Sequence, residues 1–499
     1  MQVKKEDLLK IFGTEGVSFD DALLKSFGKT DMCISGVCPE CVVYAENSSQ
    51  IENFIQLANR TGTPVIPVSS CGGGHKRGGT LPLCAGTIIL SLERMKKIIE
   101  LNEPFRMLTI EAGVTYGEVN DYLKNYGLMV DMPLAPKAER SVAASLLEGE
   151  PRLNPNINWA SYSPLSCTEV IWGDGTRMFT GEAGTSAPDY DTMRQKSHIA
   201  MTMNCGPANF DYNRVLYGAQ GTTGVVSWVA LRCGILPSVH NMYFLHSDTP
   251  SELVGMLYDL EHVRFGECLL LVNAAAFAAL ATDSEEDCCK LQKKLPPWVC
   301  AVSFANRPPF SEKRAFAHEA GARRFAEARG LTLESSLAGI SGEQFKEKIF
   351  NPCAPGKYWK DLRRGASMDV TFISTMDRFS AFDEELRSVA RLSEISMDNI
   401  SVSLQPLHQG VNCQCDFSIA YDPENTEEKA EAARLWEHLV KRFSEMHAFF
   451  AHPVGLECQI QFEKDPDTTV MQRKMKDIFD PNGIMNPGKL VDYRKEGKA

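Results

Sequence analysis

The chain has 499 residues, 43% of them hydrophobic and 23% charged, and its formal net charge is −12 at pH 7. This length predicts about two or three domains, and the composition excludes a disordered chain. The excess of acidic residues argues against nucleic acid as a partner, because a negative surface repels polyanions.

The longest apolar stretch covers residues 268–281 and contains Asn273. A membrane-spanning helix needs about 20 apolar residues, so we predict no membrane span. Glu6 and Asp7 interrupt the N-terminus before any long apolar region, unlike a secretory signal. We therefore expect a cytoplasmic protein whose 16 cysteines are reduced and mostly buried.

The first part of the chain predicts a compact α+β unit. Ser49 and Glu52 form a capping box that starts a helix, and Thr115 and Glu118 start a second one. Short β-branched runs between these two helix starts predict strands at residues 64–68, 88–92 and 107–114.

A glycine-rich loop, residues 69–79, joins the first two of these strands and contains five glycines. Its backbone N–H groups have no β-carbon beside them, which suits a pyrophosphate. The segment matches neither the P-loop pattern nor the Gly-x-Gly-x-x-Gly pattern. A phosphate-binding loop is therefore predicted, with a flexible surface turn as the alternative.

The next part predicts a hairpin over residues 169–179, with its turn at Gly173-Asp-Gly175, and an apolar strand over 225–231. From about residue 239 the chain alternates strands and amphipathic helices, which predicts an antiparallel sheet with helices on one face. Strands are expected at 301–304, 370–374, 401–404 and 415–421. Helices are expected at 251–262, 312–329, 383–392 and 427–449.

A series of short motifs follows in a fixed order: Cys41-Val-Val-Tyr44, Pro64-Val-Ile-Pro-Val68 with the triple glycine after it, Gly86-Thr-Ile-Ile-Leu-Ser-Leu-Glu-Arg-Met95, Ile110-Glu-Ala-Gly-Val114, Ser141-Val142, Glu169-Val-Ile-Trp-Gly-Asp-Gly175, Gly218-Ala-Gln-Gly-Thr-Thr-Gly-Val-Val226 and Phe479-Asp-Pro-Asn-Gly-Ile-Met-Asn-Pro-Gly-Lys489. In this order the set resembles the FAD-linked oxidases of the vanillyl-alcohol oxidase and p-cresol methylhydroxylase (PCMH) superfamily. The likeness extends over about residues 38–235 and 470–490.

The resemblance implies an α+β fold with a two-subdomain PCMH-type FAD-binding domain plus a cap domain with an antiparallel sheet and helices. The FAD-binding domain would cover residues 1–237, with subdomains at about 38–130 and 131–237. The cap, which makes the substrate pocket, would cover 238–455, and residues 456–499 would return to the FAD-binding domain.

By position, the resemblance implies contacts with FAD from Ser69, Ser70, Cys71, Gly72, Gly73, Gly74, His75, Pro133, Ser141, Ser145, Gly221, Thr222, Gly224, Val226, Asn486 and Lys489. Ala143-Ala144 departs from the family, since many members have two glycines there. His75 stands where some relatives attach FAD covalently and others carry Thr. A covalent link, a hydrogen bond to phosphate or loop, and no direct role all remain open.

Flavin enzymes take hydride at N5, so the protein must accept a proton and hold the substrate. Candidates for these roles are Glu148, Arg152, Tyr358, Arg364, His408 and Gln414. The resemblance makes His408 the base and Gln414 a hydrogen-bond donor, with a satisfied structural histidine as the alternative for His408. Glu148 and Arg152 would be base and carboxylate anchor, or simply a surface pair. Tyr358 and Arg364 would bind a phenolate or carboxylate, or belong to a solvated basic turn.

The sequence thus predicts an oxidoreductase, an FAD-dependent dehydrogenase or oxidase. It would transfer hydride from a small hydroxy acid or a phenolic alcohol to flavin N5 and pass electrons to a protein acceptor or oxygen. The first alternative is a flavoprotein subunit that relays electrons within a multi-subunit complex. The second is a zinc-bound interaction protein using Cys38, Cys41, Cys413 and Cys415, although no metal site is expected. We expect a homo-oligomer.

Overall fold

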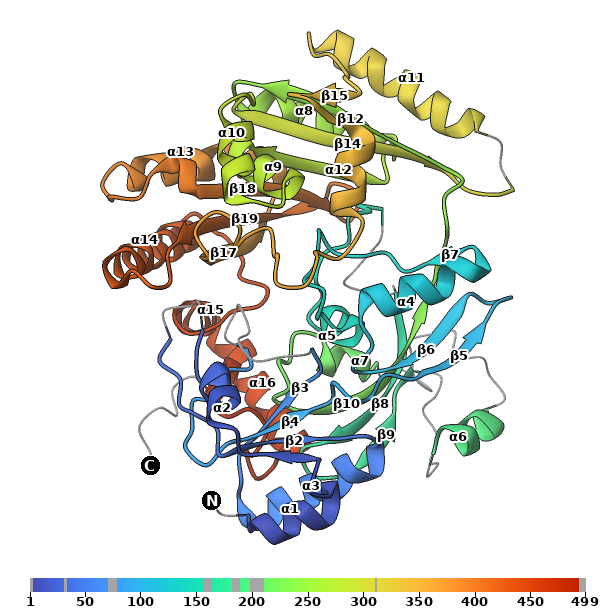
Figure 1. The fold of residues 1–499 in the computed structure, drawn as a ribbon, viewed down its shortest axis with the longest axis vertical. Helices are drawn as coiled ribbons and strands as arrows, with labels where there is room; N and C mark the ends of the chain where they lie inside the picture. The colour runs from blue at the N-terminus through green and yellow to red at the C-terminus, as the bar shows by residue number, and fades with distance from the viewer. Residues whose placement is uncertain are drawn as a thin grey trace.

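The structure, a computed structural model, describes residues 3–30, 34–70, 79–156, 164–181, 189–197, 211–309 and 312–492. Two smaller sheets form the lower half of the molecule in Figure 1, and one large sheet forms the upper half. Within the described residues, no helix is both long and apolar enough to cross a bilayer.

The first small sheet has the strand order β1 (Val17–Ser18), β2 (Cys41–Tyr44), β4 (Ile88–Ser91) and β3 (Val65–Val68). Strands β2 and β3 run parallel to β4, an arrangement that requires long crossover connections between the strands. Helix α3 (Ser48–Thr61) links β2 to β3 and confirms the predicted helix. Its cap differs from the prediction, because the Asn47 side chain accepts the Gln50 N–H at 3.0 Å. Gly62, at φ 62°, ends the helix.

The second small sheet is antiparallel, with the order β5 (Ile98–Asn102), β6 (Met107–Glu111), β10 (Gly224–Arg232), β8 (Leu165–Trp172) and β9 (Arg177–Phe179). The predicted hairpin is confirmed, since Val170 pairs with Met178 across a turn in which Gly175 has a φ of 87°. The capping box of Thr115 and Glu118 is confirmed as the start of α4 (Tyr116–Leu123).

Helices surround these two sheets, and the end of the chain packs with them. The helices are α1 (Lys5–Phe12), α2 (Asp21–Phe27), α5 (Val142–Leu147), α6 (Tyr190–Ser197), α7 (Asn213–Leu216), α15 (Leu456–Lys464) and α16 (Pro466–Phe479). Ile484 and Met485 belong to the hydrophobic core that both sheets share, and Met485 bridges to Val65 of β3. The buried Lys476 donates to the carbonyl oxygen of Thr222 at 2.8 Å.

The large sheet is antiparallel throughout, with the order β12 (Val239–Ser247), β14 (Trp298–Asn306), β13 (Cys268–Asn273), β18 (Ile400–Leu407), β19 (Asn412–Tyr421) and β17 (Ala366–Ser374). The predicted strands correspond to β14, β17, β18 and β19. The apolar stretch at 268–281 divides into β13 and helix α9 (Ala274–Ala281), because the Asn273 side chain caps α9 by accepting the Ala276 N–H at 2.9 Å.

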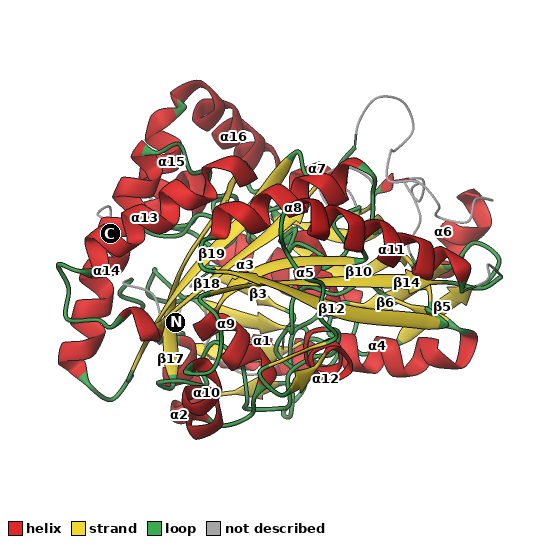
Figure 2. Ribbon diagram, turned by 90° about the horizontal axis from the view of Figure 1, so that it is seen from above, coloured by secondary structure: helices red, strands yellow, loops and turns green. Residues whose placement is uncertain are grey.

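Helices cover both faces of this sheet, which corrects the expectation of a single covered face. One face packs against α8 (Pro250–His262), α11 (Lys313–Ala328), α13 (Phe379–Ala390) and α14 (Thr426–Glu445), and Figure 2 shows α8 and α11 lying over the strands. The other face packs against α9, α10 (Glu285–Gln292) and α12 (Gly342–Ile349) beside β12, β14 and β13. Two-residue strands complete the fold, β7 (Leu128–Met129) with β11 (Gly234–Ile235) and β15 (Ser336–Leu337) with β16 (Ile340–Ser341).

The part of this second face on β17, β18 and β19 carries polar side chains in aligned rows. Thr371 pairs with Asp416, which pairs with Ser403, and Gln414 pairs with Gln405. Side chains two residues apart on a strand share a face, so these groups form one polar surface. This surface is the part of the large sheet that faces the site described next.

Candidate active site

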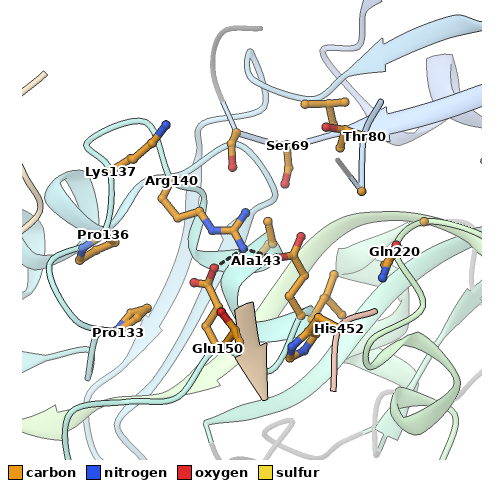
Figure 3. A pocket seen from close by; sticks show the side chains of 18 of the residues that line it. Ser69, Thr80, Pro133, Pro136, Lys137, Arg140, Ala143, Glu150, Gln220 and His452 are labelled. Atoms are coloured by element: carbon orange, nitrogen blue, oxygen red, sulfur yellow. Dashed lines mark hydrogen bonds and ion pairs between the residues drawn. The ribbon is translucent and has the colours of Figure 1, made fainter. Parts of the chain in front are cut away.

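A cavity of about 570 Å³ lies between the two halves of the molecule. Its described lining comes from the ends of β3 and β10, the segment around α5, the polar surface of the large sheet, and the segment after α14. Figure 3 shows side chains from these elements converging from several sides. A volume of this size accommodates a sizeable part of a cofactor together with a small substrate.

The wall formed by the small sheets brings backbone close to the cavity. Gly221 has a φ of +67°, and a Cβ there would lie 2.6 Å from Cγ of Pro67. A Cβ on Gly224 would lie 2.7 Å from the carbonyl oxygen of Ile171. Glycine is therefore required at both positions.

Three buried polar atoms in this wall lack a hydrogen-bond partner among the described residues. They are Oγ1 of Thr80, Oε1 of Gln220 and Oγ1 of Thr223. Buried polar groups are normally hydrogen-bonded, so these atoms fit a ligand that offers both donors and acceptors along its length. A dinucleotide such as FAD has this chemistry.

A compact ion-pair network occupies the middle of the cavity. Nη2 of Arg140 lies 2.5 Å from Oε2 of Glu148 and 2.6 Å from Oε1 of Glu150 (Figure 3). Burial by itself lowers the pKa of Arg140, but the two carboxylates outweigh burial and raise this pKa above its usual value. The guanidinium is therefore permanently charged and fixed.

The cap wall is built on the polar surface of the large sheet and on the segment before it. Nζ of the buried Lys360 lies 2.9 Å from Oδ2 of Asp369 and 2.5 Å from Oδ2 of Asp416. Burial lowers the pKa of Lys360, but the two aspartates outweigh it and raise this pKa. Tyr358 and Trp359 line the cavity beside this cluster.

Two family models match the chain, "FAD binding domain" over residues 39–151 and "FAD linked oxidases, C-terminal domain" over residues 408–490. The chain therefore contains an FAD-binding domain and, near its end, the C-terminal domain of FAD-linked oxidases. FAD is its cofactor, and the three buried polar atoms without partners are consistent with this group.

The alignments with two relatives cover nearly the whole length of this flavoprotein. It is 21% identical over 466 residues to a mitochondrial D-lactate dehydrogenase [cytochrome] of Arabidopsis thaliana, covering 91% of this chain and 73% of that protein. It is 21% identical over 507 residues to a D-2-hydroxyglutarate dehydrogenase of Stutzerimonas stutzeri, covering 97% and 98%. The solved structure of p-cresol methylhydroxylase with substrate bound shares the fold, with a TM-score of 0.78 at 15% identity and coverage of 97% and 96%.

The residues expected to contact FAD fall into three groups according to their position relative to the cavity. Those that line the cavity are Ser69, Ser70, Pro133, Gly221, Gly224 and Val226. Those that are buried but outside the described lining are Ser141, Ser145, Thr222, Asn486 and Lys489. Cys71, Gly72, Gly73, Gly74 and His75 lie outside the described residues, so the covalent link remains a prediction.

Asn486 joins two loops of the cavity wall that the small sheets form. Its Nδ2 donates to the carbonyl oxygens of Gly79 at 2.8 Å and Gln220 at 2.6 Å. Ser141 acts similarly, because its backbone N–H donates to Oγ of Ser70 at 3.1 Å. Both residues therefore fix the loops of the cavity from behind its lining.

Among the expected catalytic residues, Glu148, Tyr358 and Gln414 line the cavity. Arg152 is buried outside the described lining, where its Nη1 lies 2.5 Å from Oη of Tyr116 and 2.9 Å from Oγ of Ser145. Arg364 also lies outside the described lining, and its Nη2 is 2.6 Å from Oε2 of Glu428 in α14. The roles predicted for these residues stay predictions.

His408 lies just beyond β18, in the turn before β19, with a φ of 49°, and it is not among the described lining residues. Burial lowers its pKa. His452, which sequence reasoning did not select, lines the cavity instead (Figure 3). The only local feature of the sequence that could have indicated His452 is the His-Pro pair in the segment between α14 and α15.

The cysteines expected for the zinc alternative are far apart in the fold. Cys41 is buried on β2, and Cys38 is exposed just before it. Cys413 and Cys415, with their Sγ atoms 3.7 Å apart, lie in the hydrophobic core of the large sheet. No cluster of three or more metal-ligating His, Cys, Asp or Glu side chains occurs in the described part of the chain.

Proposed function

We propose that this flavoprotein oxidises the CH–OH group of a small 2-hydroxy acid. The observation that carries the choice is the cap wall, where Thr371, Ser403, Gln405 and Gln414 present hydrogen-bonding groups toward the cavity. A phenolic ring would be better matched if these strands presented apolar or aromatic side chains toward the cavity. The names of the D-lactate and D-2-hydroxyglutarate dehydrogenase relatives support the same substrate class.

Bound FAD supplies the hydride acceptor for such a reaction. The protein must then take the proton of the substrate hydroxyl, and we assign this role to His452. It is the one histidine in the described lining of the cavity. An imidazole changes protonation near neutral pH, which suits a general base.

The carboxylate of the substrate needs a cation that is not already neutralised. Arg140 and Lys360 each contact two carboxylates within 2.9 Å. Lys137 has a weaker pairing, with its Nζ 3.7 Å from Oδ2 of Asp361 and its side chain 36% exposed at the edge of the cavity. We therefore assign the substrate carboxylate to Lys137.

The test is anaerobic mixing of the purified, FAD-loaded protein with D-lactate, D-2-hydroxybutyrate and 4-cresol. We expect the hydroxy acids to bleach the flavin absorbance near ~450 nm, and 4-cresol to leave it unchanged. Bleaching by 4-cresol alone would contradict the proposal. Reduction by no small alcohol, but by an added redox protein, would instead support the electron-relay alternative.

We also propose that a protein accepts the electrons, which the word "cytochrome" in the name of the Arabidopsis relative supports. The reduced enzyme should be reoxidised faster by cytochrome c than by dissolved oxygen. Stopped-flow reoxidation with each acceptor measures this directly, and a faster reaction with oxygen would identify an oxidase.

A further inference from the structure

The segment of residues 449–453 carries His452 from the large sheet toward the small sheets, and hydrogen bonds hold it at both ends. At its start, the Ile373 N–H of β17 donates to the carbonyl oxygen of Phe449 at 2.8 Å, and the Phe449 N–H donates back at 3.1 Å. At its end, Nε2 of Gln220 donates to the carbonyl oxygen of Pro453 at 2.9 Å. The backbone of His452 therefore lies between an anchor on the large sheet and an anchor on the small-sheet side of the cavity.

Gln220 is itself fixed in the loop before β10. Its backbone has a φ of +49°, a left-handed conformation that is uncommon for a residue with a side chain. Nδ2 of the buried Asn486 donates to the carbonyl oxygen of Gln220 at 2.6 Å. From this position the Gln220 side chain reaches a residue 233 positions later in the chain, and Figure 3 shows it near His452. Gln220 thus provides a fixed point beside the histidine.

Pro453 transmits this contact to His452 because the two residues form a stiff pair. The proline ring fixes the φ of Pro453 and confines the residue before it to extended backbone conformations. Holding the Pro453 carbonyl therefore restricts the orientation of the backbone at His452. Sγ of Cys458 also donates to this carbonyl oxygen, at 3.0 Å, but Cys458 belongs to α15, which directly follows the segment. That contact is local, whereas the Gln220 contact joins the segment to the loop before β10.

We propose that Gln220 is a positioning residue that holds the imidazole of His452 in place at the cavity. The inference rests on the proposed function, in which His452 is the base. A general base must lie within hydrogen-bond reach of the proton that it accepts, and a displacement of about 1 Å slows a reaction about 10²-fold. When the Gln220 bond is removed, the segment loses its link to the loop before β10, and the imidazole shifts relative to the substrate.

Two variants separate this role from cofactor binding. Gln220→Leu removes the amide, whereas Gln220→Glu keeps an acceptor of similar size but removes the donor to Pro453. Anaerobic flavin reduction by the hydroxy acid, expressed per bound FAD, should slow about 10- to 100-fold in both variants, with KM within about twofold of the wild-type value. Gln459→Leu, at an exposed glutamine of α15, should keep the wild-type rate. A wild-type rate in both Gln220 variants would overturn the inference.

The double variant Gln220→Glu/His452→Asn tests whether Gln220 acts through His452. Once the imidazole is absent, the amide has no base to position. The double variant should therefore be no more than about twofold slower than His452→Asn alone. A further loss of about tenfold or more would overturn the inference, because it would give Gln220 an effect on the reaction that does not pass through His452.

Hydrogen exchange followed by mass spectrometry measures the anchoring of the segment without turnover. In the FAD-loaded protein, peptides that cover residues 449–457 should exchange at least about threefold faster in Gln220→Glu than in the wild type or in Gln459→Leu. Unchanged exchange would overturn the inference even if flavin reduction slows. A wild-type rate in His452→Asn would instead refute the base of the proposed function, while faster exchange in Gln220→Glu would still show that Gln220 holds this segment.

Discussion

Glu261, near the end of α8, is a buried acid whose removal should stabilise the protein in a pH-dependent way. Its side chain is 3% exposed, and neither carboxylate oxygen has a hydrogen-bond partner in the part of the chain that the structure describes. Burial raises the pKa of Glu261 from 4.5 to about 7. A Cβ at Gly410 would lie 3.0 Å from the Cβ of Glu261, so the acid is packed under the turn between β18 and β19.

The direction in which the free energy of unfolding changes with pH follows from comparing the folded and unfolded chains. Below pH 4.5 Glu261 is protonated in both states, and its ionisation costs nothing. Between 4.5 and 7 only the unfolded chain ionises freely, so stability is lost as the pH rises through this window and the loss is complete above about pH 7. At 1.36 kcal/mol for each pKa unit, the full loss is about 3 kcal/mol.

Glu261→Gln removes this loss. The gain in free energy of unfolding over the wild type should therefore be about 3 kcal/mol larger at pH 8 than at pH 4.5. Urea unfolding of both proteins at the two pH values, followed by circular dichroism, measures the difference, with the exposed Glu437→Gln as the control. A gain of the same size at both pH values would refute the reasoning, since it would not depend on ionisation.

Three further predictions concern the site. His452→Asn should slow flavin reduction by the hydroxy acid about 10²- to 10⁴-fold in stopped-flow measurements without changing FAD content, and a wild-type rate would exclude it as the base. Lys137→Met should raise KM while kcat stays near the wild-type value. Steady-state rates measured over a range of substrate concentrations up to saturation would show both effects. Lys360→Met removes the ammonium that contacts the buried Asp369 and the half-buried Asp416, and thermal unfolding should show a loss of about 3–5 kcal/mol, whereas a loss below about 1 kcal/mol would mean that the cluster is hydrated.

Local signals in the sequence predicted several elements of the fold correctly. The capping box at Thr115 and the glycine turn of the 169–179 hairpin depend on residues only a few positions apart. By contrast, β12 and β13 were not predicted. The apolar run at 268–281 has no period that separates a buried strand from a buried helix, and Asn273 divides it only through its role as a cap.

The candidate site was less accessible to sequence reasoning because its contacts join distant positions. Lys360 meets Asp416 across 56 residues, and nothing near either residue indicates the pairing. The resemblance placed His408 on the hairpin of β18 and β19, which contributes other residues to the described lining of the cavity. The alternation along β18 turns Ser403 and Gln405 toward the cavity, but the chain enters its turn before His408.

The two hydrogen bonds of Asn486 also have a consequence for the order of events during synthesis. They connect this residue to Gly79 and Gln220, which precede it by 407 and 266 residues. Both loops leave the ribosome long before the side chain that holds them is made. A nascent chain can therefore form its sheets early, but the link that Asn486 makes between these two loops forms only when translation is almost complete.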